Sequence, residues 1–318
     1  MKIALLGTGF GQAHAAVYAL RPDVDEVVVF GRTPAKLATI SGQFGFATTT
    51  DLDAVITDSA VDLVDICLPT RLHAEVAAGA MQAGKDVLIE LPLATTMEDA
   101  YRIVAVQQAT GRQAFVDMFS RFSPASQQLR QAVAAQRYGP LMAVEIEGRT
   151  ALLWEGYDLG LSTLALDMMH ADFDLVTGLL GQPTTVHVLG AGGPCGRGSA
   201  AEVILGYPNA IARCASSSLM PQPYGVRGGW RATFTGAILE YAMRADFTGQ
   251  GPATLTEYTA DGEHAIDLPD ASPPYTAMID HVLACLTGHV GNLVEPASAL
   301  PALELTLDVQ SRLTKPVS

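Results

Sequence analysis

The first residues of the chain contain a glycine-rich segment with the features of a phosphate-binding turn. The apolar run Ile3–Leu6 leads directly into Gly7-Thr8-Gly9-Phe10-Gly11, and small residues of helical period follow. Gly7 permits a tight turn, and Gly9 lets the backbone approach a pyrophosphate at a helix N-terminus, where free N–H groups favour anions. The third glycine of this pattern is expected at position 12, which is Gln12, with Gly11 one place early. Between a strand and a helix, the segment predicts a nicotinamide dinucleotide site rather than a plain glycine turn.

The end of the second apolar segment bears on which nucleotide binds. NAD-binding versions of this unit place an Asp or Glu there, roughly 20 residues after the glycines, to bind the ribose 2′-hydroxyl. Here the sequence reads Phe30-Gly31-Arg32-Thr33. The missing carboxylate removes a charge that would repel a 2′-phosphate, and Arg32 and Thr33 supply a cation and a hydroxyl. NADP(H) is the preferred cofactor on this reasoning; NAD(H) is the alternative if Arg32 is only a solvated loop residue.

The elements that must position these residues have the pattern of a parallel sheet covered by helices. Short apolar segments alternate with longer segments of helical period up to about residue 120. The expected strands are Ile3–Leu6, Val27–Phe30, Leu63–Leu68, Asp86–Ile89 and Ala114–Val116, and the expected helices are Ala13–Leu20, Pro34–Phe44, His73–Ala83 and Met97–Ala109. We therefore expect an α/β fold whose residues 1–121 form a doubly wound Rossmann domain that binds NAD(P).

The order of elements changes from residue 122 onward. A helix at about 125–135 and an alternating strand at Met142–Arg149 precede a helix at about 162–180. The expected elements that follow are strands at Thr185–Leu189, Glu202–Gly206, Ile211–Ser217, Trp230–Phe234, Ala237–Met243 and Thr254–Thr259, then helices at Tyr275–Thr287 and Ala297–Arg312. Consecutive strands indicate a large open, mostly antiparallel sheet. Residues 122–318 are expected to form a second α/β domain.

Composition narrows the classes of partner. At 318 residues the chain exceeds the usual size of one hydrophobic core, so two domains are the default. A net charge of −14 without any Lys/Arg-rich run disfavours nucleic acid and anionic membrane surfaces. No window approaches about 20 consecutive apolar residues, and no signal-peptide pattern is present, so a cytoplasmic protein is expected. The four cysteines are widely spaced, which suggests neither a disulfide framework nor a metal site.

Further motifs resemble one enzyme family. Leu68-Pro69 precedes His73, Ala83-Gly84-Lys85 leads into a strand, and Glu90-Leu91-Pro92-Leu93 forms the turn after it. With Arg121-Phe122-Ser123-Pro124, the helix Asp167–Gly181 and the segment Pro296–Leu300, these motifs resemble the glucose-fructose oxidoreductase, inositol dehydrogenase and rhizopine-catabolism (Gfo/Idh/MocA) family over essentially the whole chain.

The resemblance implies hydride transfer between NAD(P) and a sugar, cyclitol or related polyhydroxylated small molecule, which needs one group to polarise the oxygen and one to move its proton. It also implies a homodimer or homotetramer that forms through the C-terminal sheet. The residues expected at the cofactor are Gly7, Thr8, Gly9, Phe10, Gly11, Gly31, Arg32, Thr33, Leu68, Pro69, His73, Glu90, Leu91 and Pro92. Glu90 resembles the family glutamate at the nicotinamide ribose, and His73 is either a cofactor residue or a helix cap.

The chain departs from the family pattern at the residues that carry the chemistry. The family has a lysine in Glu-Lys-Pro, where this chain has Leu91, which neither donates a hydrogen bond nor carries a charge. The family's Asp-x-x-x-His pair begins at Asp167, but its histidine position is Ala171 and the histidine falls at His170. Residues three and four apart are both neighbours on a helix, so His170 can still lie beside Asp167, aimed about 100° differently.

His170 is the expected proton-transfer and substrate residue, because the ordinary pKa of histidine lies near neutrality. Asp167 is its expected catalytic partner, and Asp174, four residues on, is expected to orient it. The alternatives are a histidine hydrogen-bonded within a domain interface and acids that are only polar helix positions. Arg121 and Tyr157 are further substrate candidates; Arg121 equally fits an ion pair across the domain boundary, and Tyr157 a loop anchor.

Three functions fit these observations. The first is an oxidoreductase of NAD(P), preferring NADP(H), that acts on CH–OH groups. The second is a catalytically degenerate cofactor-binding protein that acts as a sensor or subunit, which the absence of the lysine favours. The third is an enzyme that uses tightly bound NAD(P) transiently, for epimerisation or elimination.

Overall fold

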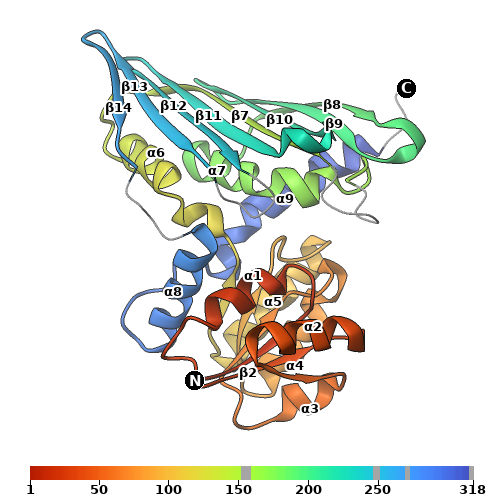
Figure 1. The fold of residues 1–318 in the computed structure, drawn as a ribbon. Coiled ribbons are helices and arrows are strands. Elements are labelled where there is room, and N and C mark those ends of the chain that lie inside the picture. The colour runs from red at the N-terminus through yellow and green to blue at the C-terminus, as the bar shows by residue number, and fades with distance from the viewer. Residues whose placement is uncertain (152–158, 246–250, 269–272, 315–318) are drawn as a thin grey trace. The chain divides into compact units, whose positions relative to one another are not determined.

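The computed structural model describes residues 1–151, 159–245, 251–268 and 273–314, and the chain divides into two compact units (Figure 1). The first unit comprises Met1–Phe122 and Ser272–Leu300, and the second comprises Ser123–Ala271 and Pro301–Ser318. The first boundary lies one residue from the expected one. Residues 272–300, which the sequence pattern assigns to the second domain, instead belong to the first unit.

The first unit is built on a parallel sheet whose strand order is β3-β2-β1-β4-β5-β6. Its strands are β1 (Lys2–Leu6), β2 (Glu26–Phe30), β3 (Ala47–Thr49), β4 (Leu63–Ile66), β5 (Asp86–Ile89) and β6 (Ala114–Val116). Apolar side chains of β1 and β4 are buried on both faces, as parallel strands between helix layers require. The chain reverses its direction of winding between β1 and β4, and ligands of such sheets bind outside the carboxyl ends of the strands at this switch point.

Helices complete the first unit. They are α1 (Gly11–Tyr18), α2 (Pro34–Phe44), α3 (Leu52–Thr57), η1 (Thr70–Leu72), α4 (His73–Gln82), α5 (Met97–Thr110), η2 (Phe119–Phe122) and α8 (Pro274–Leu286). Helix α8 joins this unit because its apolar residues Met278, Ile279 and Val282 are fully buried. The following loop is fixed by hydrogen bonds to the last strand, from Asn292 Nδ2 to the Ala114 carbonyl and from the Val116 amide to the Val294 carbonyl.

The second unit is an open sheet of order β14-β13-β12-β11-β7-β10-β9-β8. Its strands are β7 (Leu141–Ala151), β8 (Thr185–Gly192), β9 (Ser199–Gly206), β10 (Ile211–Met220), β11 (Val226–Phe234), β12 (Ile238–Ala245), β13 (Ala253–Thr259) and β14 (Gly262–Ile266). Strands β7 and β10 pair in parallel, and the other pairs are antiparallel. The expected mostly antiparallel sheet is confirmed.

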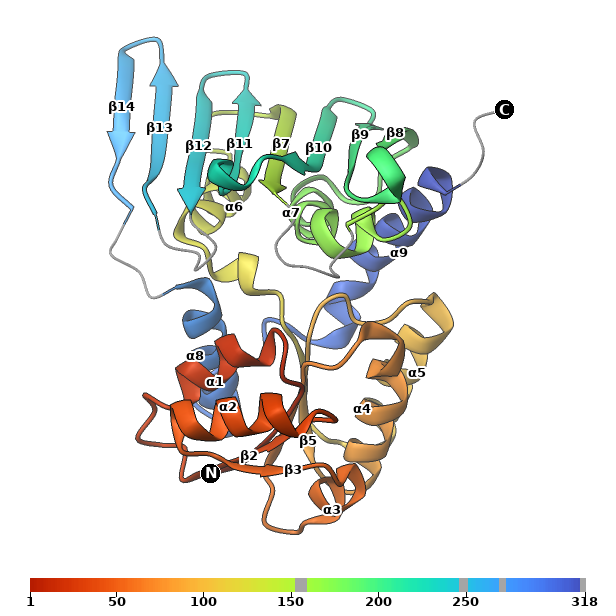
Figure 2. The same ribbon diagram turned by 45° about the vertical axis from the view of Figure 1, so that its right-hand side comes forward.

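One face of this sheet is covered by helices, as Figures 1 and 2 show. The covering elements are α6 (Pro124–Ala134), the π-helical turn η3 (Ala165–Met169), α7 (His170–Leu180) and residues 301–313 of α9 (Pro296–Leu313), and short 3-10 turns η4 (Pro194–Gly196) and η5 (Gln222–Tyr224) join strands. Val144, Ile146 and Cys214 of the sheet and Phe173 of α7 are buried between the two layers. The other sheet face carries alternating charged residues.

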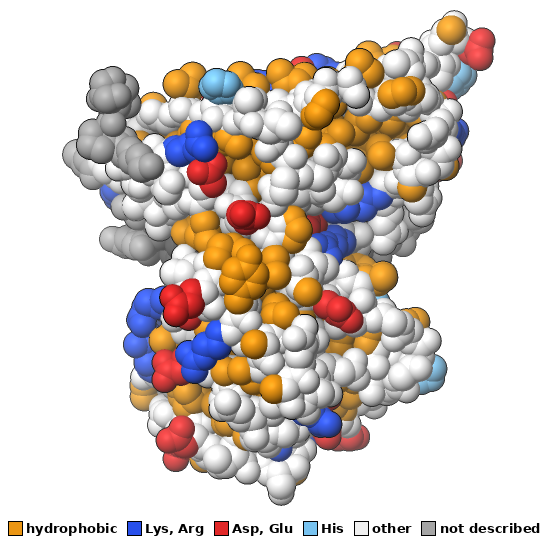
Figure 3. Space-filling view, turned by 180° about the vertical axis from the view of Figure 1, so that it is seen from behind, with side chains coloured by type: hydrophobic (Ala, Val, Ile, Leu, Met, Phe, Trp, Pro, Cys, Tyr) orange, Lys and Arg blue, Asp and Glu red, His pale blue; other side chains and the backbone are white. Residues whose placement is uncertain are grey.

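The expected elements form with bounds shifted by a few residues. The pattern missed β3, α3 and β14, which are short. None of the described helices is long and apolar enough to cross a membrane. On the face shown in Figure 3, Lys and Arg side chains are interspersed with Asp and Glu, so the described residues form no continuous basic area there.

Candidate functional site

The glycine turn after β1 has the geometry that a pyrophosphate needs. Gly7 has a φ of +125°, and a Cβ there would lie 2.2 Å from the Cys67 carbonyl oxygen, so only glycine fits. A Cβ on Gly9 would meet nothing within 4 Å, so the turn is open on that side. Gly11 begins α1, and its Cβ would lie 3.4 Å from Cys67 Cβ and Leu5 Cδ1. Gly11 therefore allows the close helix–strand packing that the third glycine of the pattern usually provides, one residue early.

A side chain at position 31, at the end of β2, would have to displace the ends of two neighbouring side chains. Gly31 is buried, and a Cβ there would lie 2.7 Å from Thr8 Cγ2 and 3.0 Å from Leu37 Cδ2. Arg32 and Thr33, which follow, are exposed, and Thr33 is the N-cap residue of α2. The methyl group of Thr8 on the glycine turn thus fills the space that a carboxylate-bearing residue 31 would enter.

His73 ties together the turns that follow β4 and β5. Its Nε2 lies 2.8 Å from the Leu68 carbonyl oxygen and its Nδ1 lies 3.1 Å from that of Pro92. Burial lowers the pKa of His73, so the neutral ring is favoured, and it donates a hydrogen bond to one of the two carbonyls while its other nitrogen only contacts the second. The side chain is buried at the start of α4. His73 is thus a brace between two turns at the carboxyl edge of the sheet, next to Leu91.

A buried polar cluster lies beneath the same edge. His14 of α1 places Nδ1 2.8 Å from Asp65 Oδ2 on β4 and Nε2 3.1 Å from Asp117 Oδ2 after β6. The Tyr18 hydroxyl donates to the same Asp65 oxygen at 2.7 Å. The side chains of His14, Asp65 and Asp117 are fully buried. The cluster therefore joins one helix to the ends of two strands that are far apart in sequence.

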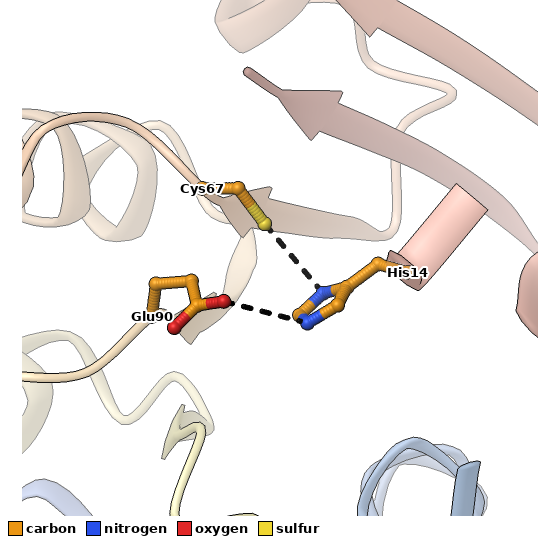
Figure 4. Close-up of side chains that lie close together, drawn as sticks. All are labelled: His14, Cys67 and Glu90. Carbon is orange, nitrogen blue, oxygen red and sulfur yellow. Dashed lines mark hydrogen bonds and ion pairs between the residues drawn. The ribbon is translucent and has the colours of Figure 1, made fainter. Parts of the chain in front are cut away.

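Glu90 and Cys67 complete this cluster, which Figure 4 shows in part. Glu90 Oε1 lies 3.7 Å from His14 Nε2, and Cys67 Sγ lies 3.6 Å from His14 Nδ1. Glu90 Oε2 accepts a hydrogen bond of 2.9 Å from the Leu91 amide. The three ligand-type atoms lie close enough together to suggest a metal ion. However, the thiol and the carboxylate approach different ring nitrogens, and both nitrogens already contact aspartates, so the geometry favours a protonated histidine instead.

The electrostatics of the cluster agree with this interpretation. Burial is the largest single influence and opposes a charged His14, but Asp65, Cys67 and Asp117 together outweigh it, so the pKa of His14 is well above its ordinary value. Burial, assisted by Asp117, raises the pKa of Glu90 to about 8. Burial likewise raises the pKa of Asp117, and of the Cys67 thiol. The cluster therefore holds protons near neutral pH.

The second unit contains the histidine singled out by its sequence position. His170 is buried, and its Nδ1 lies 2.8 Å from Thr306 Oγ1 of α9, which itself donates to the Ala302 carbonyl. The Thr306 oxygen therefore accepts from His170, which fixes the Nδ1 proton. Asp167 lies in the π-helical turn just before, with its side chain exposed. A π turn holds more residues than an α turn, so the angle between Asp167 and His170 around the helix axis differs from the one that α-helical spacing predicts.

The remaining acids of α7 have separate environments. Asp174 is buried and forms an ion pair of 3.2 Å with Arg130 of α6. Burial raises the pKa of Asp172 to about 7, and its Oδ2 has no hydrogen-bond partner among the described residues.

Arg121 donates to the Leu293 carbonyl and to Ser298, within the first unit. Tyr157 lies outside the described residues.

Sequence reasoning missed His14, Asp65 and Asp117. A signal was present, because Asp65 interrupts the apolar strand Leu63–Ile66 and Asp117 follows the apolar strand Ala114–Val116 directly. A charged residue in a strand buried on both faces needs a partner. His14, on a helix of mostly small and apolar residues, is the complementary group.

Residues 1–118 match the model of an oxidoreductase family with an NAD-binding Rossmann fold, Gfo/Idh/MocA. The chain is 34% identical over 137 residues to 4-carboxy-2-hydroxymuconate-6-semialdehyde dehydrogenase of a Sphingobium species. The matched segment covers 42% of this chain and 44% of that protein. It is 29% identical over 184 residues to inositol 2-dehydrogenase of Rhizobium meliloti, covering 57% and 56%. The chain thus spans about half the length of these relatives.

Nearly the whole chain has the same fold as a solved structure. UDP-N-acetylglucosamine 3-dehydrogenase from Acidithiobacillus ferrooxidans superimposes with a TM-score of 0.81 and 24% identity, over 98% of this chain and 97% of that one. The Rossmann domain and the open sheet expected from the sequence are therefore both confirmed.

Proposed function

We propose that this chain, a member of the Gfo/Idh/MocA oxidoreductase family through residues 1–118, is an NAD(P)-dependent oxidoreductase that transfers a hydride to or from a polyhydroxylated small molecule. The observation that carries the proposal is the glycine turn: Gly7 closes it, Gly9 leaves it open and Gly11 brings α1 against β1. This turn lies at the carboxyl ends of the strands at the switch point of the sheet. The substrate class, a sugar or cyclitol, rests on relatives such as inositol 2-dehydrogenase.

NADP(H) is the proposed preference. The absence of a carboxylate at position 31 and the exposed Arg32 beside it support this choice, because a 2′-phosphate would find a cation and no repelling charge. The contact between position 31 and Thr8 supports it further, since an acidic residue there would have to displace the Thr8 methyl group. NAD(H) binding remains compatible with the rest of the turn.

Because the turn fits a dinucleotide, roles can be assigned to the residues around it. The amide groups at the start of α1 and the helix dipole bind the pyrophosphate. The bound nicotinamide supplies hydride transfer. Leu91, where the family resemblance implies a lysine, keeps water from the reacting carbon but moves no proton. His170, whose Nδ1 proton is fixed by Thr306, is proposed to exchange a proton with substrate through Nε2, and Asp167 is proposed as its neighbour at the substrate.

The alternative is a cofactor-binding protein without turnover, and Leu91 is the observation that favours it. The third alternative is an enzyme that keeps NAD(P) tightly bound and uses it transiently, as in epimerisation. The test combines a fluorescence titration with NADPH and a turnover screen over sugars, cyclitols and their keto forms. Stoichiometric turnover with nucleotide release supports the oxidoreductase. Binding without net turnover over the panel supports the sensor or, where substrate is isomerised, transient use.

The open face of the second sheet is proposed to mediate self-association into a homodimer or homotetramer. Exposed apolar residues Ile204, Ile211 and Leu219 lie on this face beside the ion pairs of Arg231 with Glu145 and Glu240. Such a mixed surface is typical of an interface. Sedimentation analysis of the wild type and of Ile211→Glu tests this, because a charge on this face should shift the population to the monomer.

A further inference from the structure

The buried cluster beneath the strand ends has more acidic groups than one histidine can neutralise. Three carboxyl groups, those of Asp65, Asp117 and Glu90, surround the imidazole of His14. If all three were ionised, the buried cluster would carry two net negative charges. Burying unpaired charge costs several kcal/mol per ion, so at least one carboxyl group keeps a proton.

The geometry indicates which carboxyl groups share this proton. Asp65 is satisfied on both sides, because Oδ2 receives bonds from His14 and Tyr18 and Oδ1 contacts the Cys67 thiol. Asp117 Oδ1 and Glu90 Oε1, in contrast, are buried and have no hydrogen-bond partner among the described residues. Both acids approach the same nitrogen, His14 Nε2, at 3.1 and 3.7 Å. Glu90 and Asp117, which both approach Nε2 on the same side of the imidazole, are therefore the acids best placed to hold this proton.

The groups that face this proton come from every element packed around it. They are His14 and Tyr18 of α1, Asp65 and Cys67 at the end of β4, Glu90 at the end of β5, Asp117 at the end of β6 and Tyr275 of α8. His14 is the cationic group among them, and the phenols and the thiol stay neutral because burial raises their pKa values.

We infer that Glu90, with Asp117 and His14, forms a proton-holding site coupled to the redox state of the nucleotide. This rests on the proposed function. Glu90 lies at the carboxyl edge of the sheet beside Leu91, and it is 9% exposed whereas Asp117 and Asp65 are fully buried. The oxidised nicotinamide ring carries a positive charge and the reduced ring does not. A positive charge near a carboxyl group favours its ionised form, so the oxidised nucleotide expels the proton and the reduced nucleotide retains it.

This coupling balances the proposed reaction. In the oxidation direction Glu90 begins ionised. The alcohol C–H bond breaks with its electron pair, which reduces the nicotinamide, and the O–H bond breaks as the C=O bond forms. His170 takes the alcohol proton and passes it to solvent, and the Glu90 carboxylate takes up one proton from solvent because its affinity for a proton rises when the ring loses its charge. In the reverse direction Glu90 releases that proton to solvent, and His170 supplies the proton of the forming alcohol. Glu90 thereby supplies a proton-holding group in a chain that has Leu91 in place of lysine.

Calorimetric titrations of the full chain with NADP+ and with NADPH, in two buffers of different ionisation enthalpy, give the protons exchanged for each nucleotide. At pH 8, where the pKa of Glu90 leaves it about half protonated, NADP+ should release about half a proton more than NADPH. The 2′-phosphate is common to both nucleotides, so its own titration cancels. Equal proton counts for the two nucleotides would overturn the inference.

Variants separate this result from other causes. Glu90→Gln should abolish most of the difference between the nucleotides while both still bind, and Asp117→Asn should reduce it. Glu98→Gln, a change of the same chemistry at an exposed residue of α5, should leave it unchanged. A difference that persists in Glu90→Gln would assign the proton elsewhere and refute the role of Glu90. If neither nucleotide binds the wild type, the proposed function itself fails, an outcome distinct from binding without proton exchange.

Discussion

His14 lies between Asp65 and Asp117, with one ring nitrogen 2.8 Å and the other 3.1 Å from a carboxylate oxygen. A histidine that contacts a carboxylate through each ring nitrogen in this way forms an ion pair with both acids. It lies below the carboxyl edge of the first sheet. It links α1, which starts at the glycine turn, to β4 and to the segment after β6. The stability of the nucleotide-binding edge and its proton content therefore depend on the same side chain.

Replacement of His14 should be strongly destabilising. His14→Ala leaves Asp65 and Asp117 buried without their cation, which typically costs about 3–5 kcal/mol. Urea unfolding at pH 7 measures the change in the free energy of unfolding. His264→Ala, at an exposed position of β14, is the control and should cost less than about 0.5 kcal/mol. A similar, small effect of both variants would show that these ion pairs contribute little.

The contribution of Glu90 to the stability of the folded protein should fall as the pH rises from about 4.5 to about 8. The folded state keeps the Glu90 proton up to a pKa of about 8, whereas the unfolded chain loses it near the ordinary value of 4.5, so the folded state binds more protons in this range. The slope from one such group is at most about 1.4 kcal/mol per pH unit. His14, whose pKa is raised, acts with the same sign, because its stabilising charge is present at low pH and is lost as the pH rises through its folded pKa.

Unfolding of Glu90→Gln over the same pH range isolates the carboxyl group. The variant should show a shallower pH dependence and should equal or exceed the wild type in stability at pH 8, where the wild type must bury an ionising acid. Glu98→Gln should keep the wild-type slope. Parallel curves for all three proteins would contradict the assignment of a buried proton to Glu90.

An aspartate at position 31 should not by itself convert the cofactor preference. Its Cβ would meet Thr8 Cγ2 at 2.7 Å and Leu37 Cδ2 at 3.0 Å, so Gly31→Asp should weaken both NADPH and NADH. In Gly31→Asp/Thr8→Ala the obstructing methyl group is absent, and the ratio of the NADPH and NADH affinities should move toward NADH by at least about tenfold, or 1.4 kcal/mol. A change of preference from NADPH to NADH in Gly31→Asp alone would show that Thr8 moves aside without cost.

His170→Ala should lower turnover at least about tenfold, as loss of a proton-transfer group does, with the affinity for NADPH unchanged. Thr306→Val removes the acceptor of the Nδ1 proton and should shift the pH profile of turnover while retaining measurable activity. Steady-state kinetics over pH measure both. An unaltered rate in His170→Ala would restrict this histidine to a packing role.

Local patterns in the sequence predicted the parts of the structure that depend on neighbours in the chain. The five apolar strands of the first sheet and the turn at Gly7 and Gly9 follow from hydrophobic period and glycine chemistry alone. The short elements β3, α3 and β14 were not predicted, because three to six residues are too few to show a hydrophobic period. The membership of α8 in the first unit was not predicted either, since its apolar face does not specify which core it covers.

The candidate site was less accessible to such reasoning because it depends on contacts between distant segments. Asp65 and Asp117 each look like a polar residue at a strand end until the order β1-β4-β5-β6 brings both to His14. The π-helical turn before His170 changes its direction without any signal in residue spacing. Likewise, the conflict between position 31 and Thr8 arises only when the turn after β1 packs against the end of β2.

The most direct test of the account is a fluorescence titration of the wild type, Gly9→Leu and Gly42→Leu with NADPH. Gly9 and Gly42 both have open space where a Cβ would point, but only Gly9 lies on the turn, whereas Gly42 lies on the exposed side of α2. The wild type and Gly42→Leu should bind NADPH saturably and alike, and Gly9→Leu should bind at least about tenfold more weakly because its side chain occupies the pyrophosphate position. Equal binding by all three proteins would contradict a nucleotide site at the glycine turn.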